Sequence, residues 1–157
     1  MCKYEICEMA TAGEMDEKGF VHGKAWHETY TGLMPDDYLN NVTLEKCVKM
    51  AHKFPQNTLL LKVNYKTVGF SCIGKSADVE DADEIIAVYL LKEYHGKKLG
   101  YELLKQTLTL RKSNRPIVLW VLKGNEKAIR FYQKVGFAFT GNEKACPFGI
   151  ELQMQMK

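Results

Sequence analysis

A short loop that combines glycines with lysines stands directly before a helical stretch, at residues 94–100 (YHGKKLG). The first turn of a helix carries backbone N–H groups without intrahelical partners and a partial positive charge, and together these attract phosphate. Gly96 and Gly100 let a ligand approach the backbone closely, while Lys97 and Lys98 add positive charge at the same place. The loop fits neither the Walker pattern nor the dinucleotide fingerprint. The loop predicts a phosphate site. The alternative is that its glycines only form a turn and that its lysines are solvated, because both cases give the same sequence pattern.

Basic residues are concentrated around this loop. Residues 92–134 hold eleven Lys or Arg side chains against three acidic ones, a net charge of +8, whereas the rest of the chain carries −5. The asymmetry favours a polyanionic ligand for the basic part, with a solvated basic helix face as the alternative. Nucleic acid is not expected as a partner, because the basic part lacks a recognised reading motif and its aromatic residues fit a buried role.

The elements that must position the loop are those of a mixed α/β protein. A continuous apolar run at 85–91 has the length of a central strand covered on both faces, and it leads into the loop and a helix over 98–111. A strand at 117–122 leads into a second helix, for which Asn125 is the expected N-cap and Gly136 the stop. Further strands are expected at 4–7, 58–63, 68–73, 137–141 and 149–156, and further helices at 13–30 and 43–53.

Length and composition favour one domain over residues 1–157, with 46% hydrophobic residues. No apolar run approaches the ~18 residues that a membrane-spanning helix needs, and the first ten residues lack the layout of a secretory signal. The five cysteines are odd in number and form no Cys-x-x-Cys pair, so neither a disulfide scaffold nor a metal site is expected. We therefore expect a cytoplasmic protein that binds no membrane, and a homodimer stays open.

Two segments resemble the motifs of a known family. Residues 88–100 (VYLLKEYHGKKLG) look like motif A of the GNAT superfamily of acyl-CoA-dependent N-acetyltransferases, whose core is Gln/Arg-x-x-Gly-x-Gly/Ala after a strand. Residues 124–137 (GNEKAIRFYQKVGF) are similar to its motif B, Asn-x-x-Ala-x-x-Phe-Tyr-x-x-x-Gly-Phe, with six positions in agreement. Residues 26–35 show a weaker similarity to the first helix of many bacterial members. The resemblance implies the GNAT fold, a mixed α/β sheet of about seven strands, splayed between the fourth and fifth and flanked by about four helices.

The chain departs from motif A at two positions. His95 stands where the family has Gln or Arg, and Lys98 stands where it has Gly. A helical first turn does not require a positive φ at Lys98, so we expect its backbone N–H to remain available to phosphate. The ring of His95 can also donate a hydrogen bond to phosphate.

The resemblance implies that acetyl-CoA is the co-substrate. Backbone N–H groups of residues 95–100 would hold its pyrophosphate, and the strand that ends at Leu90 and Leu91 would pair with its pantetheine arm, as in strand addition to an open edge. Of the motif B residues, Asn125 would help to hold the same molecule and Phe131 would pack against it. Lys134 would meet its phosphate. The cofactor-binding set is Leu90, Leu91, His95, Gly96, Lys97, Lys98, Leu99, Gly100, Asn125, Phe131 and Lys134.

The resemblance also implies two catalytic residues. A primary amine must lose a proton before it attacks a thioester, because free alkylamines have pKa values near ~10. Glu84 resembles the general-base glutamate of the family, although a solvated carboxylate in the acidic run 78–84 explains it equally well. Tyr132 resembles the motif B tyrosine that protonates the leaving thiolate, with core packing as the alternative.

The acceptor amine is expected between the first helices and the strand of Glu84, with Trp26, His27 and Tyr30 along its site, although aromatic residues at helical spacing also fit a core. The acidic run 78–84 would attract a cation. The sequence therefore predicts acetyl transfer to a small cationic amine such as a polyamine, by direct attack in a ternary complex. Acetylation of a protein at its N-terminus or at a lysine, and a catalytically weak acyl-CoA-binding sensor, stay open as alternatives.

Overall fold

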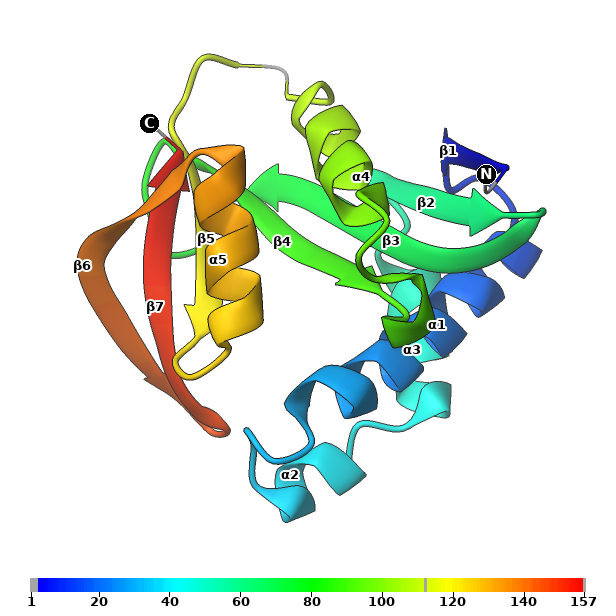
Figure 1. Ribbon diagram of the computed structural model, residues 1–157, viewed down its shortest axis with the longest axis horizontal. Helices are drawn as coiled ribbons and strands as arrows, with labels where there is room; N and C mark the ends of the chain where they lie inside the picture. Colours follow the sequence, from blue (N-terminus) through cyan, green and yellow to red (C-terminus); the bar gives the residue numbers. More distant parts are fainter. Residues whose placement is uncertain (1–2, 112, 157) are drawn as a thin grey trace.

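The computed structural model describes residues 3–111 and 113–156 and contains a seven-stranded sheet with helices on both faces (Figure 1). The strand order is β1-β2-β3-β4-β5-β7-β6, and each neighbouring pair is antiparallel except β4 and β5. The strands are β1 Tyr4–Glu8, β2 Thr58–Val63, β3 Lys66–Lys75, β4 Asp83–Leu90, β5 Ile117–Leu122, β6 Phe137–Cys146 and β7 Gly149–Met156. The helices are α1 Ala12–Tyr30, α2 Asp36–Asn40, α3 Leu44–Lys53, α4 Leu99–Leu108 and α5 Glu126–Val135, with a 3-10 turn at Lys92–Tyr94. The predicted mixed α/β fold is confirmed.

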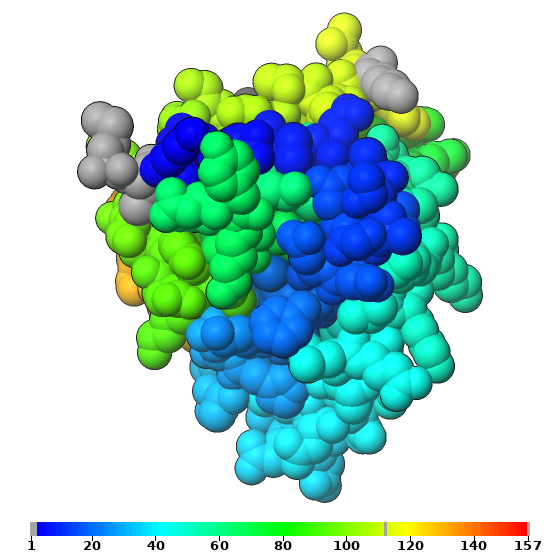
Figure 2. Space-filling model, turned by 90° about the vertical axis from the view of Figure 1, so that its right-hand side faces the viewer, coloured from blue at the N-terminus to red at the C-terminus, as the bar shows by residue number. Residues whose placement is uncertain are grey.

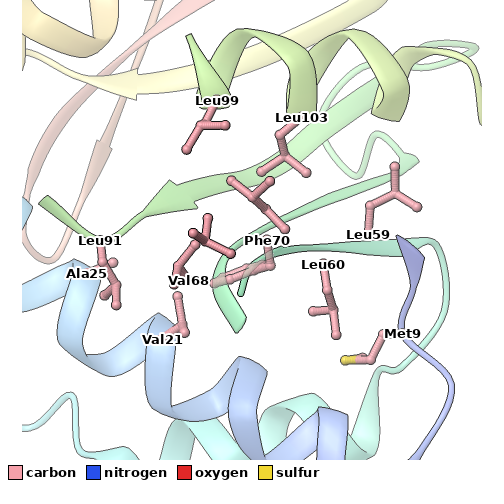
Figure 3. Packing of buried hydrophobic residues seen from close by; sticks show 12 residues of the cluster. Met9, Val21, Ala25, Leu59, Leu60, Val68, Phe70, Leu91, Leu99 and Leu103 are labelled. Atoms are coloured by element: carbon pink, nitrogen blue, oxygen red, sulfur yellow. The ribbon is translucent and has the colours of Figure 1, made fainter. Parts of the chain in front are cut away.

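The hydrophobic core joins helices on opposite faces of the sheet. Figure 3 shows Leu99 and Leu103 of α4 on one side of the strands and Val21 and Ala25 of α1 on the other. All four side chains are buried, with at most 4% of their surface exposed. Burying a large aliphatic side chain contributes roughly 1.5–3 kcal/mol, so this packing holds the start of α4 firmly against β4.

Helix α3 packs mainly on α1. Gly19 brings the two helices so close that a Cβ at this position would lie 2.5 Å from the Cα of Val48. Seen from the side, the blue α1 and the cyan α3 form one continuous surface, with the green β2–β3 turn to the left of α1 (Figure 2). The long N-terminal helix is therefore clamped between α3 and the sheet.

Strands β4 and β5 pair only at their beginnings. Asp83 lies opposite Ile117 and Glu84 opposite Val118, and no further pairs follow among the described residues. Beyond these pairs the two strands diverge (Figure 1), so the predicted splay between the fourth and fifth strands is confirmed. Because the strands are parallel, the helices that follow them, α4 and α5, both begin at the open end of the gap.

Several local predictions are confirmed in detail. The Asn125 side chain caps α5 by accepting a hydrogen bond from the Ala128 N–H at 3.3 Å, and Gly136 ends that helix with φ +123°. Two short elements are not among the four predicted helices, namely α2 after Pro35 and the 3-10 turn before His95. They are a single turn each, too short for an amphipathic period to mark them.

Four cysteines, Cys7, Cys47, Cys72 and Cys146, are free thiols, and Cys2 lies outside the described residues, as does Lys112 of the basic part. Among the helices of the described ranges, none combines the length and apolar character needed to cross a membrane. The single domain over residues 1–157 stays a prediction.

Candidate active site

A cleft of about 720 Å³ opens where β4 and β5 diverge. Residues 85–90 of β4 line it on one side, Trp120 and Val121 of β5 with α5 line it on the other, and the loop before α4 contributes to the wall. Of the residues predicted from the sequence, the cleft brings together Tyr30, Leu90, His95, Gly96, Lys98, Leu99, Gly100, Asn125, Phe131, Tyr132 and Lys134. Most of the expected cofactor residues and one of the two expected catalytic residues thus share one cavity.

Two of the predicted cofactor residues do not line this cleft. Leu91 turns into the core, where 2% of its surface is exposed. The Lys97 ammonium lies over the ring of Tyr94, 5.8 Å from its centroid. Neither side chain faces the cleft, but the N–H of Lys97 belongs to the loop described next.

The loop before α4 presents a row of free backbone donors. Within the part of the chain that the structure describes, the N–H groups of Gly96, Lys97 and Lys98 have no hydrogen-bond acceptor. The first turn of α4 adds N–H groups that helix geometry leaves unpaired. The N–H of His95, which the prediction counted with them, instead donates to the Lys92 carbonyl at 3.1 Å. The donor row therefore begins at Gly96, and its chemistry fits phosphate oxygens.

Lys98 corrects one sequence-based expectation. We expected no need for a positive φ at this position, but Lys98 is the N-cap of α4 and adopts φ +62°, ψ +9°. In this left-handed conformation the Cβ of an L-residue lies close to the neighbouring backbone, which costs roughly 1–2 kcal/mol. Glycine avoids that cost, which explains physically why glycine suits this position of the motif.

The charge of the cleft wall is one-sided. Lys98, Lys127, Arg130 and Lys134 line it, and no acidic residue does so among the described ones. All four cations stand on the loop before α4 or on α5, the elements that wall the same cleft as the free N–H groups. The charge asymmetry of the sequence therefore corresponds to a cationic wall with a row of amide donors.

The edge of β4 that faces β5 is open along most of the cleft. The Leu91 N–H donates to Val68 of β3 at 2.9 Å, so by strand alternation the N–H and C=O of Leu90 point to the open edge. The pairing of β3 with β4 skips one residue, Ile86. Such a bulge re-aims the strand and commonly stands beside functional sites. Ile86 itself is 58% exposed in the cleft.

The ring of His95 is bound to this open edge. Its Nε2 lies 2.8 Å from the Leu90 carbonyl oxygen, and its Nδ1 lies 2.8 Å from the Lys127 ammonium. Because a carbonyl can only accept and an ammonium can only donate, Nε2 carries the proton and Nδ1 accepts. Both ring nitrogens are thus engaged within the chain, rather than free for phosphate as the sequence suggested.

Tyr132 of α5 lines the cleft, and no described residue hydrogen-bonds its hydroxyl. Burial raises the pKa of Tyr132 well above its ordinary range, and the nearby hydroxyl of Tyr30 adds to the effect. Tyr30 is in turn 2.9 Å from the hydroxyl of Tyr89 on β4. A cluster of three neutral tyrosines, able to donate hydrogen bonds, therefore stands beside the bulged strand.

Glu84 lies one residue before the β4 segment that lines the cleft. It is half-buried, and Ser76 Oγ donates to its Oε1 at 3.1 Å. Burial raises the pKa of Glu84 above its ordinary value, opposed by Ser76 and by the charge of Lys144, while Asp78 and Glu151 add to the increase. Glu84 is thus neither a freely solvated side chain nor a member of the cleft wall, but a half-buried carboxylate at its edge.

The predicted acceptor residues of α1 separate in space. Trp26 packs in an aromatic group, with ring centroids 5.0 Å from Tyr30 and 6.0 Å from Phe148 of the β6–β7 turn. The His27 ring is exposed and lies 3.0 Å from the Val42 carbonyl oxygen, in the segment before α3. Trp26 and His27 are consecutive and point about 100° apart on the helix, and of the three predicted residues only Tyr30 lines the cleft.

Three residues of the site lie outside the motifs and were not predicted: Trp120 of β5, Lys144 of β6 and Glu151 of β7. Lys144 is directly opposite Glu151 in the β6–β7 pairing. Their position beside Glu84 depends on how the C-terminal hairpin meets β5, a long-range register that no local pattern encodes.

The sequence matches the model of the Acetyltransferase (GNAT) family over residues 21–137. The chain belongs to this family of acetyltransferases, for which acetyl-CoA is the co-substrate. The resemblance noted in motifs A and B is thereby confirmed. No curated protein matches the chain by sequence.

Solved structures share the fold across the whole chain. The PaiA N-acetyltransferase from Thermoplasma acidophilum, in complex with coenzyme A, has a TM-score of 0.77 at 21% identity and covers 99% of each chain. An N-acetyltransferase from Staphylococcus aureus Mu50 has a TM-score of 0.74 at 17% identity, covering 97% of this chain and 100% of its own. YncA from Salmonella typhimurium, with its cofactor acetyl-CoA, has a TM-score of 0.73 at 16% identity, covering 99% and 94%.

The cleft passes a simple test of fit for acetyl-CoA. A pyrophosphate needs donors and positive charge, which the N–H groups of residues 96–98 and four basic side chains supply. A ligand that carries amides needs unpaired backbone, which the open edge at Leu90 supplies once His95 moves. Around Gly96 no atom lies within 4 Å of the place of a Cβ, so the backbone there is accessible to a bulky anion.

Proposed function

We propose that the chain transfers the acetyl group of acetyl-CoA to the primary amine of a small cationic acceptor such as a polyamine, by direct attack in a ternary complex. The observation that carries this proposal is the opposite charge of two neighbouring regions. The cleft wall holds four cations and no described acid, whereas Glu84, Asp78 and Glu151 form an acidic group around Lys144 at its edge. One region suits a polyphosphate and the other suits an ammonium group.

The chain's own residues would hold acetyl-CoA along the cleft. The N–H groups of residues 96–100 and the side chains of Lys98 and Lys134 would bind its phosphates. Leu90 would pair through its backbone, Asn125 would hold the start of α5 in place, and Phe131 would pack against apolar parts of the ligand. When bound, acetyl-CoA supplies an acetyl group activated as a thioester.

Glu84 would accept the proton of the acceptor amine, directly or through water. Burial makes this carboxylate more basic than an exposed one, because its pKa is raised. A general base contributes roughly 10²–10⁴-fold to a rate when it is in place. The position of Glu84 beside the bulge at Ile86 puts it at the edge of the cleft where an amine would enter.

Tyr132 would stabilise the leaving thiolate. Its raised pKa keeps the phenol protonated across the physiological range, so its hydroxyl acts as a hydrogen-bond donor to developing negative charge. A donor held in a water-poor site for this purpose contributes roughly 10²–10³-fold in kcat. No covalent intermediate is required, so none of the cysteines needs to act as a nucleophile.

An amine panel with acetyl-CoA tests the proposal. Thiol release is measured with polyamines, aminoglycosides and lysine-bearing peptides, and the thermal stability of the protein is measured with and without acetyl-CoA. Release with the small polycations is the expected result. Release with peptides alone would instead support a protein acetyltransferase. Stabilisation by acetyl-CoA without release across the panel would support an acyl-CoA-binding sensor.

A cytoplasmic location and a homodimer stay predictions from the sequence. Cell fractionation tests the first, and sedimentation of the purified protein tests the second.

A further inference from the structure

Lys144 of β6 places a primary amine at the acceptor side of the cleft. Its Nζ lies 4.4 Å from the centroid of the Trp120 ring, and Trp120 lines the cleft. The same Nζ is 2.7 Å from Asp78 Oδ2 and 3.9 Å from Glu151 Oε1. Its charge also acts on Glu84. The chain thus carries its own amine beside the proposed base and on an aromatic wall of the proposed active site.

The β6–β7 hairpin that carries Lys144 is anchored over the acceptor side. Phe148, in its turn, packs against Trp26 and Tyr38, with ring centroids 6.0 and 5.0 Å away. On the other edge of the hairpin, β7 pairs with β5 along its length, and Gln153 lies opposite Trp120. Aromatic pairs contribute about 0.5–1.5 kcal/mol beyond their buried area. Lys144 therefore stands at a fixed place and not on a free loop.

We infer that Lys144 is an acceptor of the enzyme's own acetyl transfer, in cis, so that the protein acetylates itself at this residue. The inference rests on the proposed function, because it uses the same cleft and the same base. It adds a modification site and a substrate that is part of the chain.

The atoms of the step balance without any further reactant. The Lys144 ammonium gives one proton to Glu84, which passes it to water, and the neutral nitrogen then forms a bond to the acetyl carbonyl carbon. The carbon–sulfur bond of the thioester breaks, and the nitrogen loses a second proton, which goes to the leaving sulfur. Coenzyme A leaves as a thiolate that Tyr132 stabilises and that takes up one of the two protons. The products are Nε-acetyl-Lys144, coenzyme A and one released proton.

The ion pair of Lys144 with Asp78 is a small obstacle to this step. The two side chains are 36% and 44% exposed, and exposed ion pairs contribute only about 0–1 kcal/mol. The four-carbon stem of lysine is flexible, so the ammonium can leave Asp78 and stay near Trp120. Lys98, Lys127 and Lys134 also line the cleft, but they stand in the cationic wall beside the free amide donors. Among the residues that the structure describes, no carboxylate forms an ion pair with these three amines, whereas Lys144 has two such neighbours.

Acetylation would change the charge of the acceptor side. Acetyl-lysine is neutral, so Glu84, Asp78 and Glu151 would lose the cation that now stands among them. The site would become more negative and attract cationic acceptors more strongly. We expect the KM for a polyamine to be lower after self-acetylation, by up to about tenfold if one favourable charge interaction of roughly 1.4 kcal/mol is gained.

Mass spectrometry of the intact chain and of its peptides tests the inference. The purified protein is incubated with acetyl-CoA alone, and acetyl groups are mapped over time at two protein concentrations tenfold apart. The expected result is one acetyl group per chain, on Lys144, with a rate per molecule that does not depend on protein concentration. A rate that rises with protein concentration shows transfer between molecules and overturns the cis step.

Matched variants separate enzymatic from chemical acetylation. Lys144→Arg keeps the charge but removes the nucleophile, and it is expected to abolish the label. Lys49→Arg is the control, because Lys49 is an exposed surface lysine of α3 and the label should persist at Lys144. Glu84→Gln should slow the label roughly 10²-fold or more. Equal labelling of Lys49 and Lys144, or an unchanged rate in Glu84→Gln, overturns the inference.

The amine panel distinguishes this failure from failure of the proposed function. Thiol release with free amines but no label on Lys144 overturns self-acetylation and leaves the proposed function standing. If neither free amines nor Lys144 receive acetyl groups, while acetyl-CoA still stabilises the protein, both are overturned.

Discussion

The His95 ring donates a hydrogen bond through Nε2 to the carbonyl of Leu90 at 2.8 Å, on the open edge of β4. The Lys127 ammonium donates to the other ring nitrogen at 2.8 Å. These two hydrogen bonds, from His95 to Leu90 and from Lys127 to His95, therefore connect β4 with α5 across the cleft. A ligand that pairs with this edge has to displace the ring, because the carbonyl of Leu90 is already occupied.

We therefore expect His95→Ala to bind coenzyme A more tightly. The variant frees the Leu90 carbonyl and the Lys127 ammonium for the ligand, and a hydrogen bond of about 1 kcal/mol no longer has to be broken, so Kd falls by roughly fivefold. Titration calorimetry measures the change. His27→Ala is the control, because His27 bonds to Val42 outside the cleft and its loss should leave Kd unchanged. Weaker binding by His95→Ala would show that the ring contacts the ligand instead.

The left-handed conformation of Lys98 leads to a stability prediction. Lys98→Gly removes the steric cost of φ +62° but adds chain entropy to the unfolded state, so we expect a net gain of about 0.5–1 kcal/mol in the free energy of unfolding. Urea denaturation measures it. Lys97→Gly is a matched control, since Lys97 is not among the residues with positive φ, and it should destabilise the protein. A loss of stability in Lys98→Gly would contradict the strain.

Lys98 also shows where prediction from sequence ends. The apolar run at 85–91 and the helix cap at Asn125 are local patterns, and both were predicted at the right places. The positive φ of Lys98 has no such pattern in the sequence, because lysine does not mark a left-handed conformation as glycine does. The bond from His95 to Leu90 and the approach of Lys144 to Trp120 depend on contacts across the fold, because side chains far apart in sequence meet only when the strands take their register. The predicted role of Glu84 depends on the same register.

Removing one hydroxyl tests the role of Tyr132. Tyr132→Phe keeps the ring in the cleft, so coenzyme A should bind as before, while kcat should fall about 10²-fold because the thiolate loses its donor. Steady-state kinetics and calorimetry give the two numbers. Tyr65→Phe is the control, since Tyr65 stands 76% exposed at the β2–β3 turn. An unchanged kcat in Tyr132→Phe would exclude the proposed role.

The pH dependence of kcat/KM reports on Glu84. A base acts only when ionised, and burial raises the pKa of Glu84, so activity should be lost as pH falls through a value above that of an exposed carboxyl group. Ser76 donates to Glu84 Oε1 at 3.1 Å and stabilises the charged form. Ser76→Ala should therefore move the acidic limb of the profile to higher pH. An acidic limb that does not move, or that persists in Glu84→Gln, would assign the titration to another group.

The stability of the folded chain should depend on pH through His22 of α1. Burial and the charge of Lys18 lower the pKa of His22 from 6.5 to about 4. The ring packs neutral against Tyr89 and Phe70, and its Nδ1 has no hydrogen-bond partner among the described residues. The unfolded state takes up a proton first as pH falls, so stability is fully present above about pH 6.5 and is lost progressively toward pH 4, by about 3 kcal/mol in all.

Glu14, whose pKa is lowered to about 2 by Lys62 and the Ala10 and Thr11 N–H groups, loses its contribution to stability only below the ordinary carboxyl range. His22→Phe removes the titration, and urea unfolding of both proteins between about pH 7 and pH 5 should show the loss in the parent alone. Parallel pH profiles of the two proteins would show that His22 keeps an ordinary affinity for protons.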